Sequence, residues 1–137
     1  MPGLSAASKL LAIDWLLGTG APTRPAASAL CLSTVAIVDA DTGADITEPP
    51  DANGYDRQTC AFDAAAADIS ISAASETFGP CTTTDWSEVL DACICDTLTY
   101  DTGGIVVSGP LTTPLTVVVG ESMVFEQGKV IVSAVGA

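Results

Sequence analysis

Two cysteines one residue apart, Cys93 and Cys95 in the segment "DACICDTL", are the residues whose type and spacing most clearly suggest chemistry. A Cys-x-Cys pair can bind a metal, take part in redox chemistry or simply lie on a strand. On a strand both thiols point to one face, about 6.5 to 7 Å apart at a rise of about 3.3 Å per residue. That separation is too long for an easy disulfide between them.

A zinc site with four thiolates would need Cys60 and Cys81 beside this pair. Structural zinc sites usually take two ligands from a Cys-x2–4-Cys knuckle at each end, whereas this chain has one pair with a single intervening residue. We therefore expect no metal site and no cofactor. Cys31 brings the number of cysteines to five, and two interpretations stay open: thiols buried on strands, or disulfide partners.

The chain contains no histidine, which removes Ser-His and Cys-His nucleophile pairs and most zinc or copper sites. Asp39, Asp41 and Asp45 alternate like the start of a calcium loop. Such a loop needs glycine at its sixth position and glutamate at its twelfth, where this chain has Ala44 and Pro50. We interpret the segment as an acidic loop and expect neither a calcium site nor enzymatic activity.

A second acidic group, Asp85, Glu88 and Asp91, resembles the paired carboxylates of glycoside hydrolases, with Trp86 as a nearby aromatic platform for a sugar. Nothing in the spacing places two of these carboxylates across a cleft, so we interpret them as a solvated acidic edge. The larger aromatic residues are predicted to pack in the core or against the helix: Trp15, Trp86, Phe62, Phe78 and Phe125.

The formal net charge is -13. A balance this acidic repels phosphate backbones and anionic lipid headgroups, so neither nucleic acid nor a membrane is an expected partner. The apolar runs are short, and Asp14 interrupts the one near the N-terminus. We expect no membrane span, no targeting signal and synthesis in the cytoplasm, where thiols stay reduced.

The spacing of apolar residues predicts one helix over residues 4–17, with Ser5 near its start and Gly18 just past its end. Residues 18–28 are rich in Gly, Pro and Thr and predict an extended linker. The chain thus divides into an N-terminal helix and linker arm over 1–28 and a β-sandwich domain over 29–137. The apolar helix residues are candidates for an assembly interface: Leu4, Leu10, Leu11, Trp15 and Leu17.

After residue 28 the pattern changes to short segments rich in β-branched residues and separated by Gly, Pro, Asp or Asn. They predict a mainly β fold, an antiparallel sandwich or jelly-roll-like barrel. "DTGG" at 101–104 and "EQGK" at 126–129 are typical of hairpin turns, and 39–56 is expected to be a loop. The predicted strands cover 29–38, 57–62, 68–73, 87–98, 104–109, 115–120, 122–127 and 129–135.

Several segments together resemble a family of small virion proteins of tailed bacteriophages, often labelled tail fibre proteins and including capsid decoration or cement proteins. The most specific are Gly54-Tyr55-Asp56-Arg57, Trp86 before an apolar strand, and "GPLTTPLTVVVGESMVFEQGKVIV" near the C-terminus. These motifs are structural. The Cys93–Cys95 pair departs from the family pattern, so its chemistry belongs to this chain alone.

The resemblance implies a structural role, and our leading hypothesis is a capsid decoration or cement protein on the virion surface. Its partners would be the major capsid protein and its own copies, as a homotrimer. The alternatives are a tail-associated or head-fibre component that contacts the host surface, or a carbohydrate-binding module using Trp86. Because an odd number of cysteines cannot all pair within one chain, we predict at least one intermolecular disulfide from Cys31, Cys60, Cys81, Cys93 or Cys95, with Cys93 or Cys95 favoured.

Overall fold

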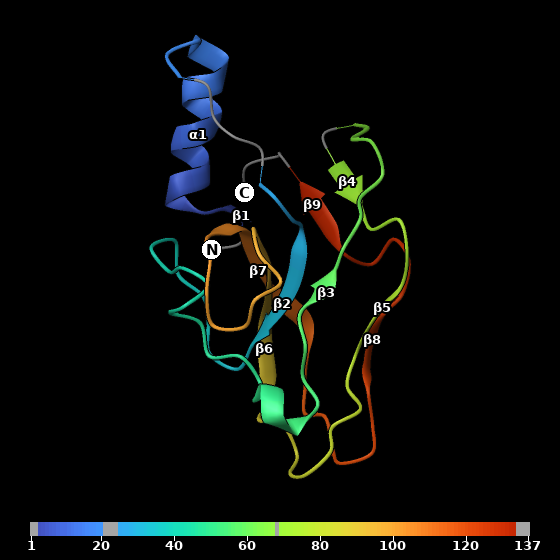
Figure 1. Cartoon of the computed structure of the whole chain (residues 1–137). Helices are drawn as coiled ribbons and strands as arrows, with labels where there is room; N and C mark the ends of the chain where they lie inside the picture. The colour runs from blue at the N-terminus through green and yellow to red at the C-terminus, as the bar shows by residue number, and fades with distance from the viewer. Residues whose placement is uncertain (1–2, 21–24, 68, 134–137) are drawn as a thin grey trace.

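The computed structural model describes residues 3–20, 25–67 and 69–133. It is mainly β, with one α-helix near the N-terminus (Figure 1). The largest sheet is antiparallel, in the order β1-β7-β6-β2-β3, and two small ribbons pair β4 with β9 and β5 with β8. The elements are β1 (Gly3–Leu4), α1 (Ala6–Leu17), β2 (Ala29–Ser33), β3 (Gln58–Thr59), β4 (Ile69–Ile71), β5 (Glu76–Phe78), β6 (Val89–Cys95), β7 (Ile105–Leu115), β8 (Met123–Phe125) and β9 (Ile131–Ser133), with a 3-10 turn at Asp51–Asn53.

The predicted fold class is therefore confirmed, with differences in detail. The prediction missed β1 and β5, because each is a short segment without a clear apolar alternation. The strand expected over 115–120 is no separate element: β7 ends at Leu115 and the chain then turns at Gly120. Of the last predicted strand, residues 134 and 135 lie outside the described part of the chain. The division at residue 28 stays a prediction, and we note that β1 joins the main sheet by pairing with β7.

The two predicted turns have different outcomes. Residues 101–104 end the loop between β6 and β7, which pair as an antiparallel hairpin. Residues 126–129 form a tight turn, with the Lys129 amide donating to the Glu126 carbonyl at 3.0 Å. This second turn is not a hairpin, because β8 pairs with β5 and β9 pairs with β4. Local turn residues do not reveal which strand the next segment will pair with.

Along β2 and β6, successive side chains point to opposite faces of the main sheet, and both faces are buried. On one face Leu30, Leu32 and Ile94 pack against Phe78 of β5 and Met123 of β8, which makes a sandwich-like layer. On the other face Cys31, Cys93 and Cys95 pack with Ile37 and Ile46, which belong to the loop before β3. The sheet is thus covered by a β-ribbon on one side and by a loop on the other.

Tyr55 lies at the centre of the first face and is fully buried. Its ring stacks on Phe78 with centroids 5.7 Å apart, and it contacts Trp86 and Tyr100 edge to face. The Tyr55 hydroxyl accepts a hydrogen bond from the Leu32 amide at 3.0 Å. Aromatic pairs of this kind contribute about 0.5 to 1.5 kcal/mol each beyond the area they bury.

Asn53 holds the loop that precedes Trp86. Its Oδ1 accepts from the Thr83 amide at 2.7 Å and the Thr84 amide at 3.2 Å, and its Nδ2 donates to the Thr84 carbonyl. The Trp86 indole in turn donates to the Asn53 carbonyl at 3.0 Å. One buried side chain therefore satisfies backbone groups that would otherwise cost about 1 to 3 kcal/mol each.

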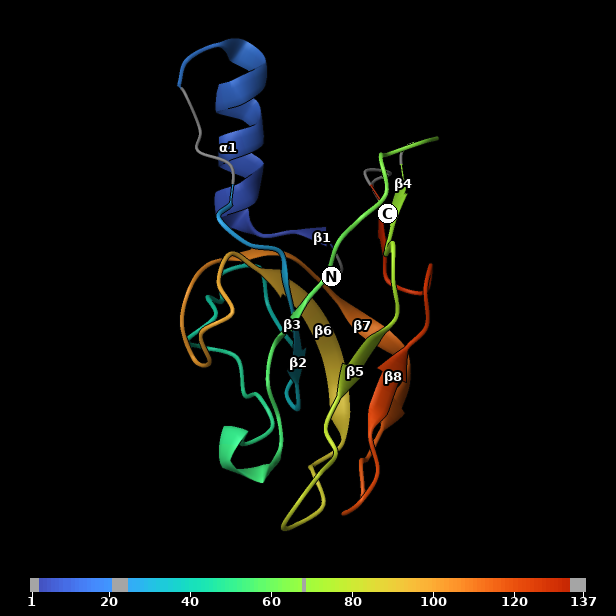
Figure 2. The same cartoon turned by 45° about the vertical axis from the view of Figure 1, so that its right-hand side comes forward.

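Helix α1 stands away from the sheets (Figures 1 and 2). Ser5 caps its start by accepting a hydrogen bond from the Ser8 amide, and Gly18 ends it in the left-handed conformation, as the sequence predicts. No residue of the helix is buried. Within the described residues, no helix has the length and apolar character needed to cross a membrane.

Candidate functional site

Three thiols from two paired strands meet on the loop-covered face of the sheet. Cys31 lies in β2 opposite Cys93 of β6, and Cys95 follows two residues later. The Sγ atoms of Cys93 and Cys95 are 3.8 Å apart, and all three Sγ atoms lie within 4.8 Å of one another. Each side chain is buried, so the described structure brings together a closed cluster of three thiols.

This geometry corrects two expectations. The Cys93 and Cys95 thiols are much closer than the 6.5 to 7 Å expected of a regular strand, because β6 has a register irregularity between Ile94 and Cys95 and the side chains converge. The third thiol is Cys31 rather than Cys60 or Cys81, which pack in the other core cluster. Cross-strand pairing brings Cys31 here, and spacing along the sequence gives no sign of it.

The three thiols differ in the ease with which they lose a proton. Hydrogen bonds from Cys31 and Cys93 lower the pKa of Cys95 below its ordinary value, and the Arg57 charge adds to this effect against the cost of burial. The pKa of Cys93 is raised because it donates hydrogen bonds to the other two and is buried. For Cys31 the hydrogen bond with Cys93 lowers the pKa, but the hydrogen bond with Cys95 and burial outweigh it and raise the pKa.

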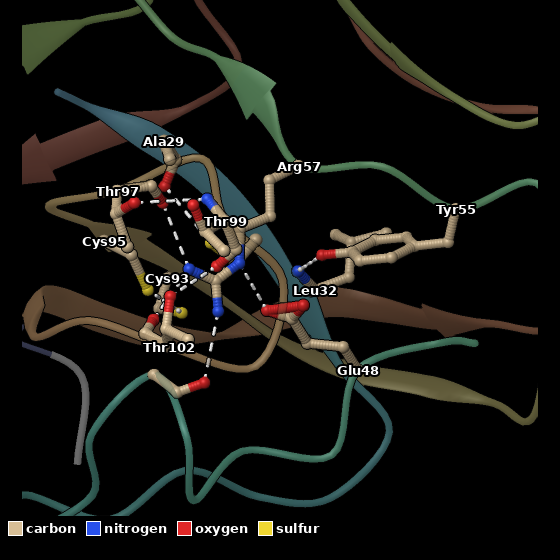
Figure 3. A network of polar contacts seen from close by, with 12 residues as sticks. Ala29, Leu32, Glu48, Tyr55, Arg57, Cys93, Cys95, Thr97, Thr99 and Thr102 are labelled. Atoms are coloured by element: carbon tan, nitrogen blue, oxygen red, sulfur yellow. Dashed lines mark hydrogen bonds and ion pairs between the residues drawn. The ribbon is translucent and has the colours of Figure 1, made fainter. Parts of the chain in front are cut away.

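The positive charge of the Arg57 guanidinium acts on Cys95, and the Arg57 side chain is fully buried. Its Nε donates to Glu48 Oε1 at 2.7 Å, and its terminal nitrogens donate to three backbone carbonyls (Figure 3). Those carbonyls belong to Gly43, Thr97 and Thr102. Arg57 therefore joins the loop before β3 to the loop between β6 and β7.

The two loops touch where Gly43 meets Thr102. The Gly43 amide donates to the Gly103 carbonyl at 2.8 Å, and a Cβ atom on Gly43 would collide with the Thr102 carbonyl. Glycine is therefore required here for close approach of two backbones. This is the physical reason for the glycine in "DADTGAD", which resembled part of a calcium loop.

The carboxylates of that segment do not converge. Asp39 pairs with Lys9 at 2.6 Å, Asp41 accepts from the Val38 amide, and Asp45 accepts from the amide and hydroxyl of Thr42. Among the described residues, the one group of side chains close enough to share a metal ion is the thiol cluster. The acidic residues of the loop act as caps and a surface ion pair.

In the second acidic group, Asp85 and Asp91 also make structural hydrogen bonds to backbone amides. Asp85 accepts from the Val119 amide at 2.9 Å, and Asp91 is buried and accepts from the Ile37 amide at 2.8 Å. Trp86 is buried in the core, as predicted, and so offers no exposed face to a sugar. Trp15 was expected to be packed as well, but 67% of its surface is exposed. The prediction for Trp15 is wrong because no part of the described chain folds over α1.

The five candidate interface residues at the N-terminus are all exposed: Leu4, Leu10, Leu11, Trp15 and Leu17. Ile13 and Leu16, which the sequence analysis did not single out, are exposed as well. Within the described residues, the contacts between the helix and the body lie near its N-terminal end, where the Ser5 amide donates to the Val106 carbonyl, the Ala6 amide donates to the Asp39 carbonyl and Lys9 pairs with Asp39. The predicted disulfide to a neighbouring chain stays a prediction: all five thiols are free and buried, so a partner would need the surrounding strands to open.

A comparison with protein families gives one match, to the family described as Podophage GP4 fiber I protein gp80, over residues 3–133. The match covers α1, all nine strands and the Tyr55–Arg57 segment. A comparison with curated proteins finds no match.

Replacing Arg57 by Ala should lower the free energy of unfolding by about 3 to 5 kcal/mol, because Glu48 would be left buried without its cation. The matched control is Lys9→Ala, which removes the half-exposed ion pair with Asp39 and should cost under about 1 kcal/mol. Urea unfolding followed by circular dichroism measures both. Equal losses in the two variants would contradict the structural role of Arg57.

Glu48 should give stability a distinctive pH dependence. Burial raises its pKa from 4.5 to about 7, more than the Arg57 charge lowers it. Between these two values the folded protein keeps a proton that the unfolded chain releases, so this group makes the folded state less stable as pH rises from about 4.5 to about 7. Glu48→Gln keeps an acceptor for Arg57 and cannot titrate.

The difference in unfolding free energy between wild type and Glu48→Gln, wild type minus variant, should therefore fall over that pH range. The fall should be at most about 3.5 kcal/mol, since the two pKa values differ by about 2.5 and one pKa unit corresponds to about 1.4 kcal/mol. Urea titrations at several pH values measure it. A difference that stays constant or rises with pH would show that Glu48 has no raised pKa.

Proposed function

The chain belongs to the phage protein family described as Podophage GP4 fiber I protein gp80, and from this premise we propose that it is a non-catalytic structural subunit of the virion, attached to its neighbours through helix α1. It is a phage virion protein of mainly β structure. The observation that carries the proposal is the helix itself, which is largely apolar, exposed and, within the described residues, joined to the body near its N-terminal end.

The free end of α1 is the part that needs a partner. Leu16 and Leu17 are 73% and 70% exposed, and Leu10, Ile13 and Trp15 are each more than half exposed. Burying one such side chain contributes about 1.5 to 3 kcal/mol. A helix that is apolar on all sides is normally buried, so α1 is suited to an assembly in which other chains cover it.

We propose a second copy of the chain as the partner, in a homotrimer. The body offers a groove of about 640 Å³ along β7 and the β8–β9 segment, lined mostly by apolar residues such as Val107, Leu111 and Phe125. Lys129 lies at this groove and is opposite in charge to Asp14 on the helix. A helix laid into the groove of the next copy is a recurring mode of recognition, and such head-to-tail contacts close into a ring when the rotation fits.

Two positions on the virion suit such a subunit. The family description names a fibre, and we place the chain in a fibre assembly for that reason. The second candidate is decoration of the icosahedral shell, where the partner would be the major capsid protein. It is favoured by the absence, in the given sequence, of an internal repeat of the kind that builds a fibre shaft.

The role in either position is mechanical. The chain has no histidine, and Asp39, Asp41, Asp45, Asp85 and Asp91 are each engaged in a structural hydrogen bond or ion pair. The acidic surface keeps particles apart in solution. It also opposes association of copies, so self-assembly should strengthen as salt screens the charges.

Replacing Leu16 and Leu17 together by Asp should abolish trimer formation without unfolding the body, because both lie beyond the anchored first turn of α1. Point changes are better than deletion, since the residues before the helix pair with β7. The matched control is Val35→Asp, a change at a loop side chain that is 53% exposed. Sedimentation equilibrium at moderate salt should give a trimer for wild type and control and a monomer for the double variant. A trimer in the double variant, or a monomeric wild type, would contradict the proposal.

The number of copies in purified virions distinguishes the two positions. A fibre or tail component should be present in on the order of tens of copies per particle, and a shell decoration protein in on the order of hundreds, because the icosahedral shell repeats its sites many times. Quantitative mass spectrometry against the major capsid protein measures the ratio. A count in the hundreds would overturn the fibre position.

A further inference from the structure

We propose that Cys31, Cys93 and Cys95 form a three-thiolate site for a soft metal ion, with Zn²⁺ the ion that fits best. The site is independent of the assembly surface on α1. It departs from the expectation of no metal, which rested on spacing along the chain and on Cys60 and Cys81 as the needed partners. Pairing of β2 with β6 supplies the third ligand instead.

The thiols lie close to the distances of a metal site, and the Cys93–Cys95 pair already matches them. Zinc binds thiolate sulfur at about 2.3 Å, so sulfurs that share one ion are about 3.8 to 4.0 Å apart. The Cys93 and Cys95 Sγ atoms are 3.8 Å apart, and the Cys31 Sγ atom lies within 4.8 Å of both. Small rotations of these side chains would therefore bring the three sulfurs to the distances at which they can share one ion.

The charges around the cluster favour a divalent ion. Three thiolates carry three negative charges, and burial of such a group in an apolar shell is costly unless it is compensated. Zn²⁺ leaves a single negative charge, and the positive charge of Arg57, which is itself paired with Glu48, acts on Cys31 and Cys95. Cu⁺ also prefers thiolates, but it would leave two negative charges in the cluster.

The burial of the three thiols determines at which stage of folding the ion would bind. Cys31, Cys93 and Cys95 are 0%, 2% and 0% exposed, and the loop residues Ile37 and Ile46 cover them. An ion must therefore bind as β2 and β6 come together, which couples metal binding to folding. Once bound, it would join the two strands at the centre of the main sheet and would exchange slowly.

The competing chemistry for three neighbouring thiols is a disulfide. Two of them would release two protons and pass two electrons to an oxidant as their sulfurs bond, and the third would stay a free thiol. The convergence of three sulfurs, rather than two, favours the metal. Intact mass separates the outcomes, because a disulfide lowers the mass by two hydrogens and a metal ion raises it.

The test uses the full chain, unfolded with reductant and refolded without oxygen in the presence of one equivalent of Zn²⁺, Cu⁺ or Co²⁺. After removal of loosely bound ions, elemental analysis should give about one Zn²⁺ per chain, and Co²⁺ should give a thiolate charge-transfer band. Cys31→Ala and Cys93→Ala should bind zinc at least about tenfold more weakly. Cys60→Ala and Cys81→Ala are the matched controls, since both thiols are equally buried but lie in the other core cluster, and they should bind as wild type does.

Wild-type protein that refolds with native circular dichroism but retains no ion would overturn the proposal, even if the cysteine variants fail to fold. So would equal retention in the Cys31→Ala and Cys60→Ala variants. Retention of Cu⁺ without Zn²⁺ would overturn the choice of ion. A disulfide between two of the three thiols in protein purified from cells with thiols blocked would overturn the site itself.

Discussion

Most of this structure depends on the ion pair and hydrogen bonds of the buried Arg57 guanidinium. It cannot lose its charge, so it must be paired and fully hydrogen bonded where it lies. Glu48 and the carbonyls of Gly43, Thr97 and Thr102 meet that demand, and in doing so they fix two loops against one face of the main sheet. Tyr55, two residues earlier, fixes the opposite face through its ring stack and its bond to Leu32. One extended segment thus holds both faces.

The molecule that results has a closely packed body and an unpartnered helix. In the body, side chains that could do chemistry are engaged: Asp91 holds the Ile37 amide, Asn53 holds the loop before Trp86, and the thiols face each other. On α1 the reverse holds, because none of its apolar side chains is buried by the described part of the chain. Such a division suits a subunit that keeps its own shape and gains its remaining stability from neighbours.

The sequence predicts those features that depend on local pattern. The period of the apolar residues places α1 and most strands, Ser5 and Gly18 define the helix ends, and the Tyr55–Arg57 motif indicates the family. The features that it does not predict depend on which strands pair. Cys31 joins Cys93 through the β2–β6 register, Glu48 meets Arg57 because two loops fold onto one face, and Phe78 reaches Tyr55 through a strand too short to show a period. Trp15 resembles a core residue by type and is exposed because no part of the described chain folds over it.

The central claim is that α1 is the attachment element of a virion subunit. A cryo-electron microscopy reconstruction of the intact virion tests it most directly, because it shows the surroundings of the helix without any change to the chain. The account predicts that density for this β-rich body is found in a symmetric assembly, with Leu16 and Leu17 covered by at least one other chain. A reconstruction in which α1 projects into solvent while the body makes the contacts would contradict it.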